Sequence, residues 1–230
     1  MPVFQLTDEY IFPNPELADE EGLLAVDGDL KPERILLAYS QGIFPWFSEG
    51  SRILWWSPNP RLLLIPAKMK RSKSLIRTLK SGKFEVRIDT NFESVIKYCA
   101  QTKRKDENGT WLVNEMIQAY IELHKRGFAH SIETYHENKL VGGLYGISLG
   151  KAFFGESMFF IKRDASKVAL SYLCDLAETW NFYFIDAQME TEHLENLGAE
   201  KWKRSDFLKI LAQALEYPSC IGKWNTDINL

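Results

Sequence analysis

The spacing of apolar residues in the first half of the chain predicts a compact module followed by two helices. Over the first sixty residues, short apolar runs alternate with prolines and tryptophans, which is typical of a small compact unit. Pro32 and Gly42 are placed as the start and the stop of one helix inside that unit. Asp89 is expected to cap a helix through Lys97, and apolar residues at helical spacing predict another helix over residues 114–125.

From residue 129 onward the apolar positions alternate with a period of two, which predicts strands. Three strands joined by short turns are expected to form an antiparallel meander over residues 129–135, 139–147 and 151–159. A helix over residues 164–180 and an apolar strand over residues 182–188 then complete a β-α-β unit, because a continuous apolar strand suits a buried parallel position. With a last helix over residues 205–215, the pattern predicts an α+β fold.

Composition excludes several classes of protein. The chain has 230 residues, of which 45% are hydrophobic and 26% are charged, as in ordinary globular proteins. Its apolar runs all fall short of the roughly 18 residues that a membrane span requires. The first residues lack the basic and apolar regions of an export signal, so a cytoplasmic location is expected.

Cysteine and histidine positions argue against a metal site or a disulfide framework. The three cysteines are odd in number, far apart in the sequence, and form no C-x-x-C pair. The four histidines include no H-E-x-x-H motif. The turn at residues 161–166 has no glycine that would let a pyrophosphate approach backbone N–H groups. We therefore expect no metal and no nucleotide or coenzyme A cofactor.

Basic residues are concentrated in one segment of a chain whose net charge is −3. Residues 68–83 contain no acidic residue and carry Lys68, Lys70, Arg71, Lys73, Arg77, Lys80 and Lys83. Such a run is commonly a solvated helix face. Against an acidic background it also fits the footprint of a protein that contacts the phosphates of a nucleic acid.

A G-x-S-x-G motif at residues 146–150 offers one candidate catalytic site. Ser148 is followed along the chain by Asp186 and His193, in the order that α/β-hydrolases use. The nucleophile of those enzymes lies on a sharp turn between a strand and a helix, whereas residues 151–155 read as another strand and place Ser148 in a hairpin. A serine hydrolase that uses these three residues is kept as the alternative function.

A second candidate site combines carboxyl and amide side chains with apolar ones. Phe154, Glu156 and Met158 alternate along one strand and are expected on one face of it, as are Asp186 and Gln188 on another strand. Buried carboxylates need partners or stay protonated, so these residues fit an apolar cavity into which a few polar groups converge. Core carboxylates that backbone donors satisfy are the alternative.

Eight short motifs, spread over nearly the whole chain, resemble in order and spacing those of one family. They are GLLAVDGDL at 22–30, GIFPWF at 42–47, WWSP at 55–58, GTW at 109–111, HSIE at 130–133, GESMF at 155–159, DAQ at 186–188 and LGA at 197–199. Each is weak alone, but their joint order is hard to obtain by chance. On these motifs the chain resembles the leucyl/phenylalanyl-tRNA–protein transferases.

This resemblance implies an aminoacyltransferase. Such an enzyme moves leucine or phenylalanine, and less readily methionine, from aminoacyl-tRNA to the α-amine of a protein that begins with arginine or lysine, which marks that protein for degradation by the N-end rule pathway. The implied architecture is a small N-terminal domain over residues 1–62 and a catalytic domain over residues 63–230, similar to the N-acetyltransferase superfold with its mixed sheet flanked by helices. Coenzyme A, a metal and a membrane are not expected, and the enzyme is expected to be a monomer.

The resemblance also implies roles for particular residues. Glu156 is expected to bind the donor's amino group, and in the mechanism of the family Asp186 polarises Gln188, whose oxygen helps withdraw a proton from the attacking amine. Because a neutral carboxamide is a very poor base, we expect Gln188 to orient the amine instead, with Asp186 fixing Gln188 or attracting the incoming cation. The residues expected to bind the aminoacyl end are Trp46, Trp111, Leu144, Phe154, Ser157, Met158, Leu173 and Ile185. The two tryptophans among them are expected to stack on the terminal adenine of the tRNA. Residues expected to contact tRNA phosphates are Lys70, Arg71, Lys73, Arg77, Lys80 and Lys83.

Overall fold

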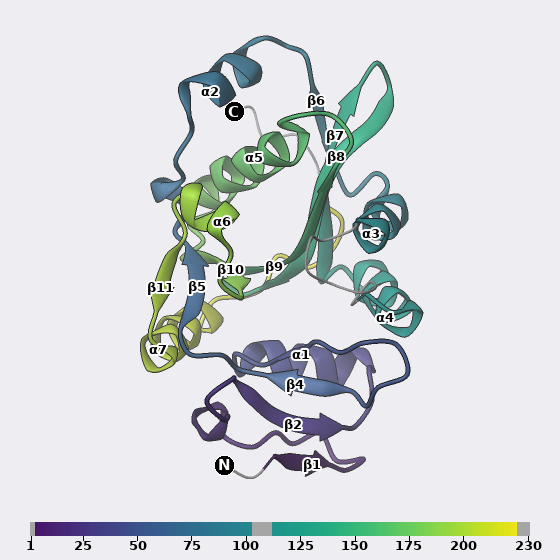
Figure 1. The fold of residues 1–230 in the computed structure, drawn as a ribbon, viewed down its shortest axis with the longest axis vertical. Coiled ribbons are helices and arrows are strands. Elements are labelled where there is room, and N and C mark those ends of the chain that lie inside the picture. Colours follow the sequence, from purple (N-terminus) through teal and green to yellow (C-terminus); the bar gives the residue numbers. More distant parts are fainter. Residues whose placement is uncertain (1–2, 103–111, 225–230) are drawn as a thin grey trace.

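Two β-sheets divide the protein into a small and a large part (Figure 1). In this computed structural model, which describes residues 3–102 and 112–224, the small part contains a sheet with the order β1-β2-β4-β3. Its elements are β1 (Phe4–Leu6), the 3-10 helix η1 (Pro15–Leu17), β2 (Leu23–Asp27), α1 (Pro32–Ser40), β3 (Phe44–Pro45) and β4 (Leu54–Trp56). Helix α1 lies between this sheet and the large part, and Gly42 follows its end with φ 75°, so the predicted helix is confirmed.

The large part is built on a seven-stranded mixed sheet with the order β11-β5-β10-β9-β8-β7-β6. Its strands are β5 (Arg61–Leu64), β6 (Glu85–Ile88), β7 (Ala129–His136), β8 (Lys139–Leu149), β9 (Ala152–Phe160), β10 (Phe184–Gln188) and β11 (Glu200–Trp202). Strands β9 and β10 pair in parallel, whereas β10 pairs antiparallel with β5 on its other side. The predicted meander and the predicted β-α-β unit are both confirmed.

Helices cover both faces of this sheet (Figure 1). They are η2 (Pro66–Lys68), α2 (Lys73–Lys80), α3 (Phe92–Gln101), α4 (Asn114–Lys125), α5 (Ala165–Thr179), α6 (Glu192–Asn196) and α7 (Arg204–Leu215). Helices α3 and α4 pack on one face, in a core that continues into α1 and the small sheet, and α5 packs on the other face. None of the helices in the described part of the chain has the length and apolar character that crossing a bilayer requires.

The α+β fold is confirmed, and the longest elements match the prediction most closely. Helix α4 has the predicted bounds, and β7, β8, β9 and α5 differ from their predicted bounds by at most two residues. Elements α6, β5, β6 and β11 were not predicted, because each is too short to show a clear period, and no bounds were predicted for α2 within the basic segment. The domain boundary at residue 62 stays a prediction, and strand β5 of the large sheet begins at Arg61.

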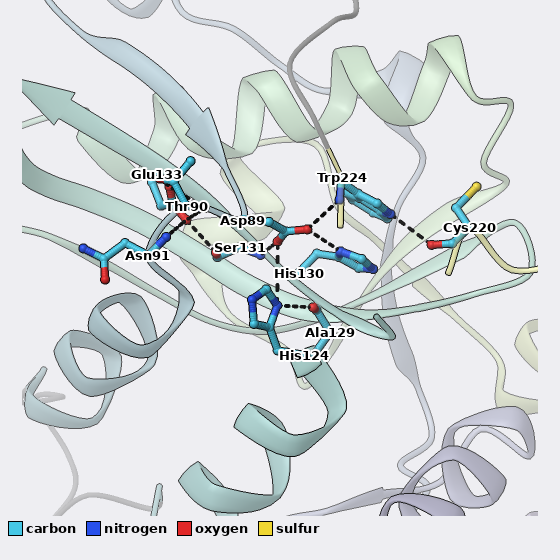
Figure 2. Close-up of polar contacts among 10 residues, drawn as sticks. All are labelled: Asp89, Thr90, Asn91, His124, Ala129, His130, Ser131, Glu133, Cys220 and Trp224. Atoms are coloured by element: carbon cyan, nitrogen blue, oxygen red, sulfur yellow. Dashed lines mark hydrogen bonds and ion pairs between the residues drawn. The ribbon is translucent and has the colours of Figure 1, made fainter. Parts of the chain in front are cut away.

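Asp89 does not cap a helix, so that prediction is wrong (Figure 2). Its carboxylate accepts hydrogen bonds from the backbone N–H groups of Ser131 (N to Oδ1, 2.8 Å) and Trp224 (N to Oδ2, 2.9 Å), and Nδ1 of His130 lies 2.8 Å from Oδ2. The rings of His130 and Trp224 are stacked with their centroids 3.8 Å apart. Asp89 therefore holds the C-terminal segment against β7 instead of starting α3.

The start of α3 is held by Glu133, a fully buried residue of β7 (Figure 2). Its Oε1 accepts hydrogen bonds from the backbone N–H groups of Thr90 (3.0 Å) and Asn91 (2.9 Å) and from the hydroxyl of Ser131 (2.7 Å). A carboxylate at this position satisfies donors that the helix leaves unpaired and interacts favourably with the helix dipole. Local sequence reasoning missed it because the cap comes from a strand more than forty residues away.

Candidate active site

A cavity of about 530 Å³ lies among β9, β10, α5, α6 and the β3 segment of the small part. Its apolar lining includes Phe44, Leu64, Leu144, Phe153, Met158, Leu170, Leu173, Ile185 and Leu194. Glu156, Asp186 and Gln188 also line it, although their exposed fractions are only 7%, 0% and 8%. The apolar cavity with converging polar groups that the sequence indicated is therefore present.

The structure brings together most of the residues that were predicted to bind the aminoacyl end. Those that line the cavity are Trp46, Leu144, Ser157, Met158, Leu173 and Ile185. Trp111 lies outside the described residues. Sequence reasoning missed Phe153 and Leu170, because an apolar residue that lines a cavity has the same pattern as one that fills a core.

Phe154 does not line the cavity, because β9 contains an extra residue. The two neighbours of Glu156 pair with consecutive residues of β8, so Glu156 is the additional residue of a β-bulge. One inserted residue moves all following side chains to the opposite face. Phe154 therefore packs against Tyr39 and Phe184 behind the sheet, while Met158 faces the cavity. The prediction that Phe154 and Met158 share a face is wrong.

Three side chains from separate elements donate hydrogen bonds to the Glu156 carboxylate. Tyr39 of α1 and Gln188 of β10 donate to Oε1, at 2.6 Å from the hydroxyl and 2.8 Å from Nε2, and Tyr120 of α4 donates to Oε2 at 2.8 Å. Burial raises the pKa of Glu156 to about 7, although these three hydrogen bonds oppose the rise. Glu156 thus changes its charge near neutral pH.

The two tyrosines also contact each other, with their hydroxyl oxygens 2.7 Å apart. Burial raises the pKa of both tyrosines well above their usual range, so each hydroxyl keeps its one proton. Both tyrosines were missed because they lie on apolar helix faces.

Asp186 and Gln188 reach the cavity through a second irregularity, in β10. The register opposite β5 shifts between them, and Gln188 has φ 62°, in the left-handed region. Oδ1 of Asp186 accepts a hydrogen bond from the backbone N–H of Gln188 at 2.8 Å. The guanidinium of Arg61, which sequence reasoning also missed, binds the Asp186 carboxylate with Nε 2.9 Å from Oδ1 and Nη2 2.7 Å from Oδ2.

The serine motif does not form a hydrolase site. Ser148 is a buried residue of β8, paired with Phe153 across an antiparallel hairpin, and is not among the cavity-lining residues. His193 and Asp186 do line the cavity. Since the strand that carries Ser148 leads into another strand rather than a helix, Ser148 does not lie on the turn that exposes a nucleophile in hydrolases.

We expect Ser148→Ala to leave the catalytic rate unchanged. Within the described part of the chain, the Ser148 hydroxyl oxygen has no hydrogen-bond partner, so its removal breaks no contact and leaves the fold intact. Turnover of the purified variant, together with labelling of the wild-type protein by a fluorophosphonate, tests this expectation. Loss of turnover in a folded variant, or covalent label on Ser148, would revive the hydrolase alternative.

The predicted tRNA-binding residues lie on and around α2, which packs on α5. Lys73, Arg77 and Lys80 are exposed on the helix itself. Arg71 is only partly exposed, because it donates to the carboxylate of Asp175 and to a backbone carbonyl of α5. Lys70 and Lys83 are exposed on either side of the helix. The basic segment is therefore a largely solvated face in which Lys68 pairs with Glu200 and Arg71 with Asp175, and its role in binding stays a prediction.

The site is thus an apolar cavity that contains a carboxyl and carboxamide cluster, and an exposed basic helix packs on α5, one of its wall helices. A family model described as "Leucyl/phenylalanyl-tRNA protein transferase" matches residues 63–212, and the model of its N-terminal domain matches residues 28–59. The chain belongs to the leucyl/phenylalanyl-tRNA–protein transferase family.

Relatives of this name are similar over almost the full length of the chain. The "Leucyl/phenylalanyl-tRNA--protein transferase" of Desulfatibacillum aliphaticivorans is 52% identical over 227 residues, which cover 99% of this chain and 97% of the relative. That of Myxococcus xanthus (strain DK1622) is 53% identical over 226 residues and covers 97% of each chain. Among solved structures, a "GCN5-related N-acetyltransferase from Kribbella flavida" aligns with a TM-score of 0.39 and 8% identity, over 73% of this chain and 60% of that one.

Proposed function

We propose that this chain transfers leucine or phenylalanine, and less readily methionine, from aminoacyl-tRNA to the α-amine of proteins that begin with arginine or lysine. The transfer marks those proteins for degradation through the N-end rule pathway. The observation that carries this proposal is the hydrogen bond between Glu156 and Gln188 inside the apolar cavity, because it places an amine-binding carboxyl next to an amide. The name of the relatives supports the same donors.

The apolar wall of the cavity accounts for the choice of amino acid. One methylene group in an apolar pocket is worth about 1 to 3 kcal/mol, so valine and alanine would leave part of this space empty. Met158 and the leucines of the wall are flexible enough to accept side chains of different shape. We infer that the pocket selects by size and apolar character, which favours leucine, phenylalanine and methionine together.

The polar groups suit a reaction in which two amines must be placed. The α-amine of the acceptor protein attacks the carbonyl carbon of the aminoacyl ester, a C–N bond forms, and the C–O bond to the tRNA ribose breaks. The nitrogen loses a proton and the ribose oxygen gains one. An α-amine has a pKa near 8, so a fraction of about a tenth is unprotonated at neutral pH, and the main need is orientation.

Glu156 has room for one further hydrogen bond. An ionised carboxylate offers about four acceptor positions, and Tyr39, Tyr120 and Gln188 occupy three of them. We assign the remaining position to the amino group of the donor amino acid, which is present in an aminoacyl ester and converted to an amide in a peptidyl ester. This contact would separate an aminoacyl ester from a peptidyl ester as the donor.

Gln188 is assigned to the attacking amine. Because an ionised carboxylate can only accept hydrogen bonds, the amide must present Nε2 to Glu156, and its Oε1 is left as an acceptor. An acceptor beside the donor ester can hold an N–H of the incoming amine and so direct its lone pair at the carbonyl carbon. A neutral amide is a very weak base, so Gln188 orients the amine rather than removing its proton.

Glu190 supports the preference for acceptors that begin with a cation. It lines the rim of the cavity, close in sequence to Gln188, and is exposed. Its Oε2 lies 2.6 Å from Nζ of Lys201, which also lies 3.3 Å from Oε1 of Glu195. We infer that an arginine or lysine side chain of the acceptor takes the place of Lys201 beside Glu190.

The enzyme is proposed to act in the cytoplasm, where charged tRNA is made, as a monomer without metal or cofactor. Within residues 3–102 and 112–224, His, Cys, Asp and Glu side chains do not gather into a group of three or more that could hold a metal ion. The proposed reaction also needs neither, because the ester is already an activated acyl donor. The partners are therefore the aminoacyl-tRNA and the acceptor protein.

Transfer of label tests the proposal. The chain is incubated with radiolabelled leucyl-tRNA and a peptide that begins with arginine, and label is expected on the peptide. The same peptide with an acetylated N-terminus should receive none, because its amine is blocked, and a peptide that begins with glutamate should receive little. If all label stays on the tRNA over a range of salt concentrations, the proposal is wrong.

Replacing Lys73, Arg77 and Lys80 together by alanine is expected to weaken tRNA binding and to flatten its dependence on salt. Each side chain that no longer neutralises a phosphate should reduce the slope of log K against log salt by about 0.7 to 0.9, so the triple variant should reduce it by about 2 to 3. Arg71 is left in place, because its removal would leave Asp175 without its partner. Fluorescence anisotropy with labelled tRNA at several salt concentrations measures both quantities.

The matched control removes exposed lysines from other faces of the protein. Lys97 on α3 and Lys209 on α7 each pair with an exposed acidic neighbour on their own helix. Their double replacement by alanine is expected to leave the salt slope as in the wild-type protein. Equal losses of affinity in the α2 variant and in this control would mean that net charge, not the basic helix, determines the affinity.

A further inference from the structure

We propose that Arg61 is a positioning residue: together with Asp186 it forms a buried pair that holds the backbone of Gln188 in the conformation that aims its amide at the incoming amine. The inference rests on the role proposed for Gln188. It assigns Asp186 to the support of Gln188 rather than to contact with the substrate.

The surroundings of Arg61 enclose its guanidinium and give each of its three nitrogens a hydrogen-bond acceptor. The residue has no solvent exposure, and its Nε and Nη2 bind both oxygens of Asp186. Its Nη1 donates to the backbone carbonyl of Gly42 at 3.2 Å. The guanidinium carbon lies 4.7 Å from the centroid of the Phe44 ring and 4.6 Å from the centroid of the Phe207 ring. A planar cation that packs against two rings, with fixed acceptors at its edge, is held in one orientation.

Asp186 connects the fixed guanidinium of Arg61 to the backbone of Gln188. Its Oδ1 accepts from Arg61 and from the backbone N–H of Gln188, two residues further along the chain. Gln188 has φ 62°, a conformation that residues other than glycine adopt only where their surroundings hold them. The hydrogen bond from its backbone N–H to the Asp186 carboxylate, which Arg61 fixes, stabilises this conformation of Gln188. It also directs the Gln188 side chain toward Glu156, where Nε2 binds.

The same contacts leave Asp186 without room for a substrate cation. The carboxylate has no solvent exposure, Oδ1 already accepts two hydrogen bonds, and Nη2 and Nε of Arg61 lie 2.7 and 3.2 Å from Oδ2. An arginine or lysine of the acceptor would have to displace a guanidinium that two rings enclose. Of the two roles that the sequence left open for Asp186, the geometry supports the one in which it fixes Gln188.

Steady-state kinetics of Arg61 variants test the proposal. Arg61→Lys keeps the charge but loses the two-pronged contact, and kcat for transfer is expected to fall at least tenfold while KM for leucyl-tRNA stays within twofold. In Arg61→Ala, guanidinium at millimolar concentration should restore part of kcat, and an equal concentration of sodium chloride should not. A merely structural role would change the amount of folded enzyme and not this split between kcat and KM.

Arg34 provides the matched control, since it is a second fully buried arginine that donates to backbone carbonyls but lies away from the cavity. Arg34→Lys is expected to lower the thermal midpoint and to leave the kcat of the folded enzyme unchanged. If Arg61→Ala fails to fold, Arg61→Met combined with Asp186→Leu replaces the buried pair by apolar side chains of similar size, which commonly preserves stability.

The outcomes separate this inference from the role proposed for Gln188. Loss of kcat in Gln188→Ala and in the folded double variant supports both. Loss of kcat in Gln188→Ala, with wild-type kcat in the folded double variant, would overturn the positioning role alone. Wild-type kcat in Gln188→Ala would overturn the role of the amide itself, and with it the reason for positioning it.

Discussion

Replacing Gln188 by alanine is expected to lower kcat for transfer from leucyl-tRNA about 100-fold, while the Kd for tRNA stays within twofold. The physical reason is that the variant loses the acceptor that orients the incoming amine, and a misplacement of about 1 Å is worth roughly 100-fold in rate. That factor corresponds to about 3 kcal/mol of transition-state stabilisation. Single-turnover transfer to an arginine peptide, with tRNA binding measured separately, gives both quantities.

The control for this experiment is His193→Ala. His193 lines the same cavity, and burial lowers its pKa, so it is mostly neutral at pH 7 and contributes no fixed charge there. The variant is expected to keep kcat within threefold of the wild-type value. A loss in His193→Ala as large as in Gln188→Ala would show that the rate depends on the shape of the cavity in general and not on the amide.

The second large effect concerns stability as a function of pH and comes from Glu156. Its pKa is about 7 in the folded protein against an ordinary value of 4.5, so folding takes up a proton between these two values. The stabilisation is complete below pH 4.5 and is lost as the pH rises to about 7. For a shift of this size, Glu156 alone should lower the free energy of unfolding by about 3 kcal/mol across that window.

Glu156→Gln removes the titration and keeps the side-chain shape. Urea unfolding of the wild-type protein and of this variant is measured from pH 4 to pH 8, and the difference in unfolding free energy is plotted, so that titrations common to both cancel. The variant is expected to gain about 3 kcal/mol relative to the wild type between pH 4.5 and pH 7. A difference that is constant over this range would mean that Glu156 ionises in the folded protein as it does in water.

The sequence predicted the elements that are long and regular, and it failed where the geometry is irregular. Helix α4 and the meander have many apolar positions at a constant period, so their bounds were close to those observed. Strand β9 has an extra residue at Glu156, and the glycine that precedes it, Gly155, is a sign of a bulge too weak to fix the register from sequence. The misplacement of Phe154 is a direct consequence of that one residue.

The polar residues of the site could be predicted from the sequence, but their hydrogen-bond partners could not. Glu156, Asp186 and Gln188 stand out because polar residues are unusual in apolar strands. Their partners Tyr39, Tyr120 and Arg61 come from segments 36 to 125 positions away, and each has a residue type that is ordinary in its own segment. Spacing rules act over a few residues, so only a three-dimensional structure could pair them.

The end of α1 is bonded to both sides of the reaction site. Tyr39 reaches Glu156, and the carbonyl of Gly42, three residues later, holds Arg61 and through it Asp186. Glu156 and Asp186 are therefore both tied to the same short stretch of chain. If the small and large parts shift slightly against each other, the two carboxyl groups should move together, and the distance between the two bound amines should change little.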